Sequence, residues 1–168
     1  MRFNLLDRII ELQPGKCIRA VTTLSPEEDY LRDHFPLFPV MPGVLMLEAM
    51  FQASAWLVRK SENFAHSTVV LKAARNVNYA NFVEPGQTLT VTADLVKQDE
   101  HTTTIKAQGS IGEGDVLKDA VKARLILERF NLAQRYPSRS ATDAYLRRRM
   151  REMFEQLFQS TSSLEPIT

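Results

Sequence analysis

One short segment of the sequence, residues 34–52, brings together side chains that could carry out acid–base chemistry. It reads HFPLFPVMPGVLMLEAMFQ, and from Gly43 onward only Glu48 and Gln52 interrupt an apolar run. A carboxylate is expensive to bury in such surroundings unless it is paired or neutralised. The position of Glu48 therefore needs either a functional or a structural explanation.

His34 and Glu48 suit the two proton transfers of an elimination reaction. Imidazole gains and loses its proton near neutral pH, so His34 is a candidate base. A carboxyl group in an apolar pocket tends to stay protonated, so Glu48 is a candidate acid. A helix that begins at Gly43 would present free backbone N–H groups to a developing oxyanion. Together these groups predict removal of a proton next to a carbonyl, with loss of a leaving group.

Each of these residues also has an ordinary structural interpretation. A lone histidine near prolines is often a surface or hydrogen-bonded residue, and a single glutamate in an apolar helix can fix specificity or pair with a loop arginine such as Arg32. Short motifs also carry a high risk of chance matches. The combination of base, acid and helix start within one segment favours the functional interpretation.

The elements that hold these residues follow from the surrounding pattern. Three evenly spaced prolines between residues 36 and 42 exclude both a helix and a central strand, so a stiff loop carries His34. Residues 43–61 contain no helix breaker after the first position, and apolar residues lie on nearly all faces, which is typical of a buried helix. Glu48 and Gln52 are four residues apart and share one face of that helix.

Strand-like alternation occurs on both sides of the predicted helix. One alternating run precedes it at residues 16–24, and further runs begin at residues 67, 88, 102 and 121, with turn sequences between them. This order of strand, loop, buried helix and several antiparallel strands indicates an α+β fold. We expect a curved antiparallel sheet that wraps around the long helix.

The chain after residue 130 has a different character. Residues 131–143 read as a polar linker, and SATD at its end resembles a capping box with Asp143 in place of glutamate. The following residues predict an amphipathic helix whose apolar stripe docks on the sheet. That stripe is Leu146, Met150, Met153, Phe154, Leu157 and Phe158, and the opposite face carries Arg147, Arg148, Arg149 and Arg151. We therefore expect one domain over residues 1–130 and a linker with an appended helix over residues 131–168.

Composition narrows the classes of function. The 168 residues fit one domain, and 21 basic against 20 acidic residues give a net charge of +1, which provides no overall attraction for nucleic acid or a membrane. Cys17 is the single cysteine, and the three histidines are scattered, so neither a disulfide framework nor a zinc-site spacing is present. The first residues suit no secretory or transit signal, and no apolar stretch is long enough to span a membrane. We expect a reduced, cytoplasmic, metal-free protein.

The segment that holds His34 and Glu48 also resembles a known active site. As it stands it reads H-F-P-x-x-P-V-M-P-G-V-L-x-x-E-A-M-x-Q, and this resembles the active-site segment of the FabZ and FabA type β-hydroxyacyl-acyl-carrier-protein dehydratases, including the spacing from His34 to Glu48. The resemblance extends to FNLLDRIIELQPGK near the start and to FVEPGQTL at residues 82–89. It covers roughly residues 3–129 and leaves out the last part of the chain.

The resemblance implies a hot-dog fold and a 3-hydroxyacyl thioester, carried on acyl carrier protein in fatty-acid biosynthesis, as the substrate. It implies a homodimer, or a trimer of dimers, in which the histidine of one subunit meets the acid of the other. His34 would take the C2 proton, Glu48 would protonate the departing 3-hydroxyl group, and the N–H of Gly43 would polarise the thioester carbonyl. No cofactor is required.

The same resemblance assigns further residues to the site. Gln52 would orient the Glu48 carboxylate, although a helix amide can equally be structural, and Phe35, Leu37 and Val44 would line the substrate site. Glutamate rather than aspartate at position 48 points to the FabZ branch, which dehydrates without isomerising the double bond.

Acyl carrier protein is acidic, so basic residues near the tunnel mouth are its natural contacts. The candidates are Arg59, Lys60, Lys72 and Arg75, and the arginine face of the last helix is a further one. Ordinary solvated surface charge is the alternative interpretation for each of them.

Two other functions stay open at this point. The first is a hot-dog acyl thioesterase, in which a carboxylate activates water, although a histidine so close to the helix start argues against it. The second is a non-catalytic hot-dog module that binds acyl chains or assembles subunits. The family commonly has glycine at the positions of Asp33 and Leu37 and often a polar residue at that of Phe38. Leu37 and Phe38 keep the last alternative open.

Overall fold

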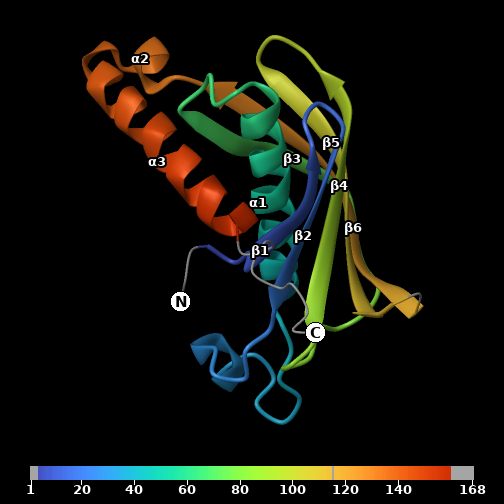
Figure 1. Ribbon diagram of the computed structural model, residues 1–168. Coiled ribbons are helices and arrows are strands. Elements are labelled where there is room, and N and C mark those ends of the chain that lie inside the picture. The colour runs from blue at the N-terminus through green and yellow to red at the C-terminus, as the bar shows by residue number, and fades with distance from the viewer. Residues whose placement is uncertain (1–3, 115, 160–168) are drawn as a thin grey trace, which may run out of the picture.

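The computed structural model describes residues 4–114 and 116–159, and in this part of the chain an antiparallel sheet curves around one long helix (Figure 1). The strands are β1 (Arg8–Gln13), β2 (Cys17–Thr23), β3 (Thr68–Tyr79), β4 (Thr88–Gln98), β5 (Thr102–Glu113) and β6 (Val116–Phe130). The helices are α1 (Gly43–Ser61), α2 (Leu132–Arg135) and α3 (Ser140–Gln159), with 3-10 turns at Asp29–Arg32 and Pro137–Arg139. The sheet order is β1-β2-β4-β5-β6-β3, which confirms the predicted α+β architecture.

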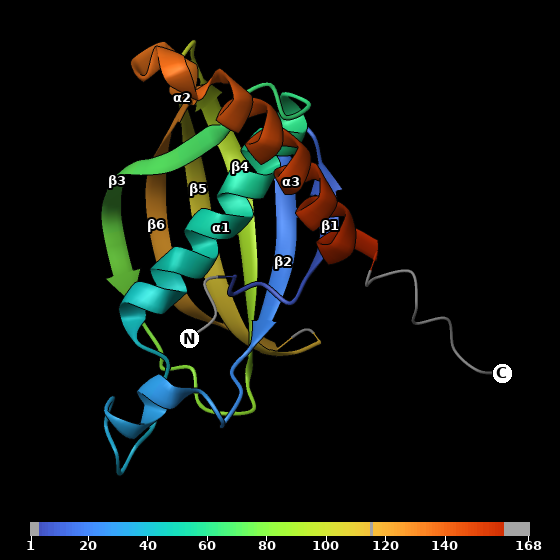
Figure 2. The same cartoon turned by 90° about the vertical axis from the view of Figure 1, so that its left-hand side faces the viewer.

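Helix α1 lies in the concave side of the sheet, as Figure 2 shows. The side of α1 that faces the sheet carries buried residues at helical spacing, each at most 2% exposed. They are Met46, Ala49, Met50, Ala53 and Leu57. The strands supply the opposing surface with alternate apolar side chains of β4 and β5, which are Leu89, Val91, Ala93, Ile105 and Ala107. This packing fixes α1 rigidly and therefore fixes every side chain that the helix carries.

The other side of α1 is only partly covered by its own chain. Val44 is 70% exposed, and Leu47, Glu48 and Phe51 are half-buried. Strand β3 lies beside this surface at one end of the sheet order, and within the described part of the chain it pairs with β6 alone. The chain thus buries one side of α1 itself, and a strip of apolar residues on the other side of α1 remains partly exposed to solvent.

Helix α3 packs beside α1 (Figures 1 and 2). In its apolar stripe Phe154 and Leu157 are buried, Leu146, Met150 and Met153 are half-buried, and Phe158 is 41% exposed. The ring of Phe154 contacts those of Trp56 and Phe64, with centroids 6.1 and 5.9 Å apart, and Leu157 is buried in the same core. The helix docks on the domain as predicted, but it packs against α1 and the edge strand β1 rather than against the face of the sheet. The part of the expected appended segment that follows residue 159 lies outside the described residues.

The expected capping box at residues 140–143 is wrong. The Asp143 carboxylate is buried and accepts hydrogen bonds from Ser67 Oγ and from the backbone N–H groups of Leu132 and Ala133, at 2.7 and 2.9 Å for the two amides. Burial alone would raise the pKa of Asp143, but these hydrogen bonds and the charge of Arg147 together lower it. The carboxylate therefore joins α3 to the start of α2 and to Ser67, the residue before β3, instead of capping its own helix.

None of the helices within residues 4–114 and 116–159 is long and apolar enough to cross a membrane.

Candidate active site

His34 lies in the loop between the 3-10 turn Asp29–Arg32 and α1. Its backbone N–H donates to the Tyr30 carbonyl at 3.0 Å, and its ring Nδ1 lies 3.0 Å from the Val40 carbonyl oxygen. A carbonyl oxygen can only accept, so Nδ1 carries the proton in this arrangement. In the neutral ring Nε2 is then the free acceptor, which is the form a general base requires.

The loop around His34 is held in an uncommon backbone conformation. Phe35 has φ of +58°, a left-handed region that non-glycine residues rarely adopt. The N–H of Phe38 donates to the Phe35 carbonyl at 2.7 Å, and the Phe38 ring packs edge-on against Phe82, with centroids 5.5 Å apart. Such strain persists only where the surroundings hold it in place, and it is frequent at functional sites.

Gly43 opens α1 in the same cavity as His34. The cavity has a volume of about 290 Å³, and Met46, Tyr79 and Phe82 are among its walls. A Cβ on Gly43 would lie 2.9 Å from a ring carbon of Tyr79, so the close approach of that ring requires glycine. The first N–H groups of a helix have no intrahelical acceptor, and the preceding Pro42 provides no side-chain cap. The N–H groups of Leu45 and Met46 donate to the Pro42 carbonyl, at 2.9 and 3.3 Å, so the amides of Gly43 and Val44 are those available to an oxyanion.

Glu48 and Gln52 form a hydrogen-bonded pair on α1. Gln52 Nε2 donates to Glu48 Oε1 at 2.9 Å, and Gln52 Oε1 accepts from the backbone N–H of Leu5, also at 2.9 Å. Because its oxygen is held by Leu5, the amide group is fixed with its NH₂ toward Glu48. The expected link between the two side chains is thus present in the structure, and both are half-buried.

His34 and Glu48 of one chain lie on different sides of α1. Glu48 follows Gly43 by five residues, which places it about 140° around the helix and about 7.5 Å along it. Met46, which lines the cavity with His34, is separated from Glu48 by about 160° around the helix axis. Glu48 is not among the residues that line this cavity. One chain therefore holds two separate groups of candidate residues, His34 with Gly43 and Glu48 with Gln52, and we call each group a half-site.

Of the remaining predicted lining residues, only Phe35 lines the His34 cavity itself. Leu37 lies with Phe35 in a shallow neighbouring pocket, where the Leu37 side chain is fully exposed. Val44 points away into solvent. Tyr79 and Phe82 were missed as site residues, because only the fold brings the end of β3 beside the start of α1. The basic candidates Lys72 and Arg75 are exposed on β3.

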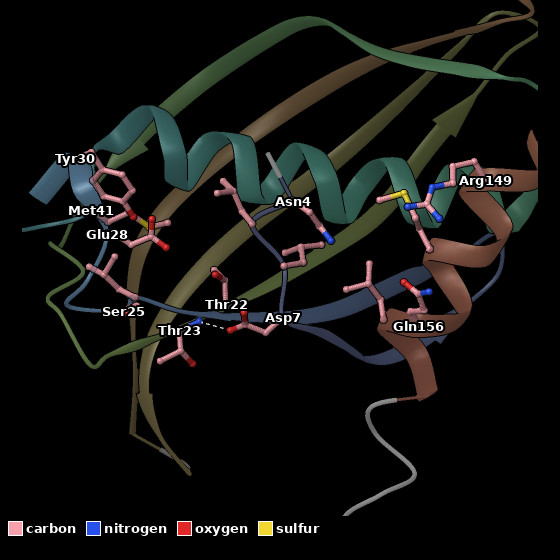
Figure 3. Close-up of a pocket in the computed structure, with 15 residues that line it drawn as sticks. Asn4, Asp7, Thr22, Thr23, Ser25, Glu28, Tyr30, Met41, Arg149 and Gln156 are labelled. Atoms are coloured by element: carbon pink, nitrogen blue, oxygen red, sulfur yellow. Dashed lines mark hydrogen bonds between the residues drawn. The ribbon is translucent and has the colours of Figure 1, made fainter. Parts of the chain in front are cut away.

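A larger cavity of about 780 Å³ shares Met41 with the His34 cavity and is lined by Leu5, the hydrogen-bond partner of Gln52 (Figure 3). Arg149 and Gln156 of α3 form one end of it, and Glu28 and Tyr30 form the other. Burial and the charge of Glu28 raise the pKa of Tyr30 to about 12, so this phenol keeps its proton. The cavity contains none of the predicted site residues, so its size does not locate the chemistry.

Comparison with known proteins places the chain in a family. The model of the FabA-like domain matches residues 1–119. The 3-hydroxyacyl-acyl-carrier-protein dehydratase FabZ of Levilactobacillus brevis is 38% identical over 108 residues, which are 64% of this chain and 73% of the relative. FabZ of Wolbachia pipientis is 34% identical over 123 residues, or 73% and 86% of the two chains.

Solved structures agree on the architecture. The dehydratase heterocomplex ApeI:P of Xenorhabdus doucetiae aligns with a TM-score of 0.59 at 22% identity, over 77% of this chain and 84% of that one. The PaaI protein of E. coli aligns with a TM-score of 0.56 at 17% identity, over 73% and 82%. These likenesses confirm the hot-dog fold alone. The sequence matches carry the identification further, and the chain belongs to the FabA-like family, as a member of the FabZ type.

Proposed function

We propose that this protein is a hydro-lyase that dehydrates 3-hydroxyacyl thioesters on acyl carrier protein to trans-2-enoyl thioesters, in fatty-acid or related acyl-chain biosynthesis. The observation that carries the proposal is the pair of half-sites, one at the start of α1 and one on its side. His34 has its Nδ1 held by Val40 beside the open amides of the helix start, and Glu48 is held by Gln52. The sequence relationship to FabZ enzymes supports the same reaction.

The reaction needs each of these groups once. Nε2 of His34 removes a proton from C2 of the acyl chain while the N–H of Gly43 hydrogen-bonds to the thioester oxygen, where negative charge develops. Glu48 gives its proton to the 3-hydroxyl group, which leaves as water when the C3–O bond breaks. The C2–C3 double bond forms, and a proton passed back from His34 to Glu48 through solvent resets the site.

The half-sites become a whole site in a homodimer. The cavity that contains His34 does not include Glu48 of the same chain, which supports an acid supplied by a second copy. The uncovered side of α1, with Val44 and Phe51, and the outer edge of β3 offer the apolar surface and the unpaired backbone that such an interface uses. A trimer of dimers is compatible with the same pairing.

The partner and compartment follow from the substrate. An acidic acyl carrier protein would approach the His34 cavity, with exposed Lys72 and Arg75 of β3 as basic contacts. The proposed chemistry uses side chains and backbone amides and needs no cofactor. We place the protein in the cytoplasm on the grounds of this role.

One assay tests the proposal in the reverse direction. Hydration of a crotonyl or longer enoyl thioester removes its conjugated absorbance, and His34→Ala or Glu48→Gln should slow this by about 10² to 10⁴-fold. The matched controls are His101→Ala and Glu100→Gln, an exposed pair whose ring nitrogen and carboxylate oxygen lie 4.0 Å apart. Release of free thiol without hydration would instead indicate a thioesterase, and neither reaction would indicate a non-catalytic module.

A further inference from the structure

A small cavity lies on the side of α1 that carries Glu48. Its volume is about 230 Å³, and its apolar walls include Phe51 and Trp56 of α1 and Met153 of α3. Its polar lining residues are Asn4 and, on α1, Gln52 and Arg59, of which Arg59 lies further along the helix. Because Gln52 is hydrogen-bonded to Glu48, this cavity adjoins the acid half-site rather than the His34 half-site.

Arg59 is a cation in largely apolar surroundings. Its Nε is shielded from solvent and has no hydrogen-bond partner among the described residues, and its guanidinium carbon lies 5.3 Å from the centre of the Trp56 ring. Burial lowers the pKa of Arg59 to about 10, and the charge of Glu62 opposes this shift. The group is therefore still protonated at neutral pH, although its charge is poorly solvated.

Glu62, the carboxylate whose charge acts on Arg59, is engaged through only one of its two oxygens. Its Oε1 is buried and has no hydrogen-bond partner among the described residues. Glu62 Oε2 lies 3.2 Å from Nη1 of the buried Arg129 and 3.0 Å from Nδ1 of His66. Arg129 also donates to the backbone carbonyls of Asp99 and Thr102. Of the two arginines near Glu62, Arg129 is thus built into the fold by several bonds, whereas Arg59 lines a cavity.

Arg59 lies on the same face of α1 as Glu48. Glu48, Gln52, Ala55 and Arg59 follow one another at intervals of four, three and four residues, which keeps them on one stripe of the helix. The rise from Glu48 to Arg59 is about 16 Å. A chain that extends from the acid along this stripe passes apolar side chains and ends at a guanidinium.

We propose that this cavity receives the far end of the acyl chain and that Arg59 binds a terminal carboxylate there, so that ω-carboxyacyl thioesters are substrates. The inference rests on the proposed function, because it takes Glu48 as the acid at C3. The apolar walls suit the methylene groups, and a guanidinium binds a carboxylate through two parallel hydrogen bonds. Such a ligand would supply the buried Nε with the acceptor that it lacks.

The test compares matched trans-2-enoyl coenzyme A thioesters over a series of chain lengths. Each length is prepared with a terminal methyl, a terminal carboxylate and the methyl ester of that carboxylate, and kcat/KM for hydration is measured. In the natural protein one range of lengths should favour the carboxylate over its neutral ester. Arg59→Met should lower that preference by about thirtyfold or more, as expected for a lost buried charge pair, and Arg59→Lys should keep part of it.

Arg19→Met is the matched control, since it makes the same change at an exposed position of β2 and should leave the preference unchanged. Hydration of methyl-ended chains with no carboxylate preference at any length would overturn this inference and leave the proposed function standing. A preference that survives in Arg59→Met would also overturn it, because another group would then bind the carboxylate. Absence of hydration with every thioester would refute the proposed function itself.

Discussion

His34 and Val40 are joined by a hydrogen bond in which the ring Nδ1 lies 3.0 Å from the main-chain oxygen. The acceptor is a backbone carbonyl six residues along the same loop, and Val40 itself is completely buried. The orientation of the imidazole is thus set by a rigid part of the core rather than by another mobile side chain. This bond decides which ring nitrogen can act as a base.

The neutral ring of His34 should therefore exist as the tautomer protonated at Nδ1. Long-range ¹H–¹⁵N spectra of the protein at alkaline pH distinguish the two ring nitrogens directly. His101, which is exposed in the turn between β4 and β5, provides the reference for an unconstrained ring. A His34 ring that carries its proton on Nε2 would contradict the assigned role.

Two inactive variants should restore activity when they are combined. If His34 of one subunit works with Glu48 of the other, a heterodimer of His34→Ala and Glu48→Gln chains contains one intact site. Random exchange of equal amounts should recover about a quarter of the natural activity, because half of the dimers are mixed and each has one working site of two. Denaturation and joint refolding, followed by the hydration assay, measures this. No recovery from a mixture shown to contain heterodimers would place both residues in the same chain.

Gln52 should act as a positioning residue for Glu48. Gln52→Leu removes the hydrogen bond to Glu48 and should lower kcat by about tenfold with little change in KM, since the bond orients the acid rather than the substrate. Gln98→Leu, at an exposed end of β4, is the control.

A second substitution at Gln52 distinguishes its hydrogen bond to Glu48 from its hydrogen bond to the Leu5 backbone. Gln52→Glu keeps an acceptor for the Leu5 N–H but, when ionised, cannot donate to Glu48. It should be at least as slow as Gln52→Leu. Full activity in Gln52→Glu would mean that the contact with Leu5 alone explains the glutamine.

Asp143 should stabilise the docking of α3. Asp143→Asn exchanges an acceptor-only carboxylate for a group that cannot accept equally from Ser67 and both amides, so the thermal midpoint should fall and α3 should be cut sooner by protease. Glu155→Gln, an exposed change on the same helix, should have little effect.

The contribution of Asp143 should depend on pH in one direction. Its pKa is lowered in the folded protein, so its stabilising effect is fully present above the unfolded value of about 3.9 and is lost as pH falls through the lower folded value. The difference in midpoint between the natural protein and Asp143→Asn should therefore shrink only in acid. A difference that grows in acid would contradict this account.

Much of the architecture could be predicted because it follows from local patterns. The expected helix over residues 43–61 coincides with α1, since a breaker-free apolar run after a proline loop leaves little alternative. The alternating runs gave β2, β4 and β5 close to their observed bounds. Strand β6 begins at Val116, five residues before the predicted start, because its first residues are exposed and do not alternate.

Strand β1 was missed for a related reason. Its burial does not alternate, and the register of its pairing with β2 shifts between Ile9 and Glu11, so the sequence shows no period of two. The short helix α2 and the early start of α3 were missed because they depend on Asp143, whose bonds reach Ser67, far away along the chain. No local pattern records such a contact.

The sequence by itself determined which groups could do chemistry here, because a histidine near a helix start and a carboxyl within an apolar run are visible as residue types at fixed spacing. It also determined that Glu48 and Gln52 share one face of the helix, since helical periodicity is local. The tertiary structure alone decided that His34 lies with Gly43 on another side of α1, that Val40 holds its ring, and that α3 closes the cavity at Arg59. Those relationships depend on packing between segments distant in sequence, which composition and periodicity do not encode.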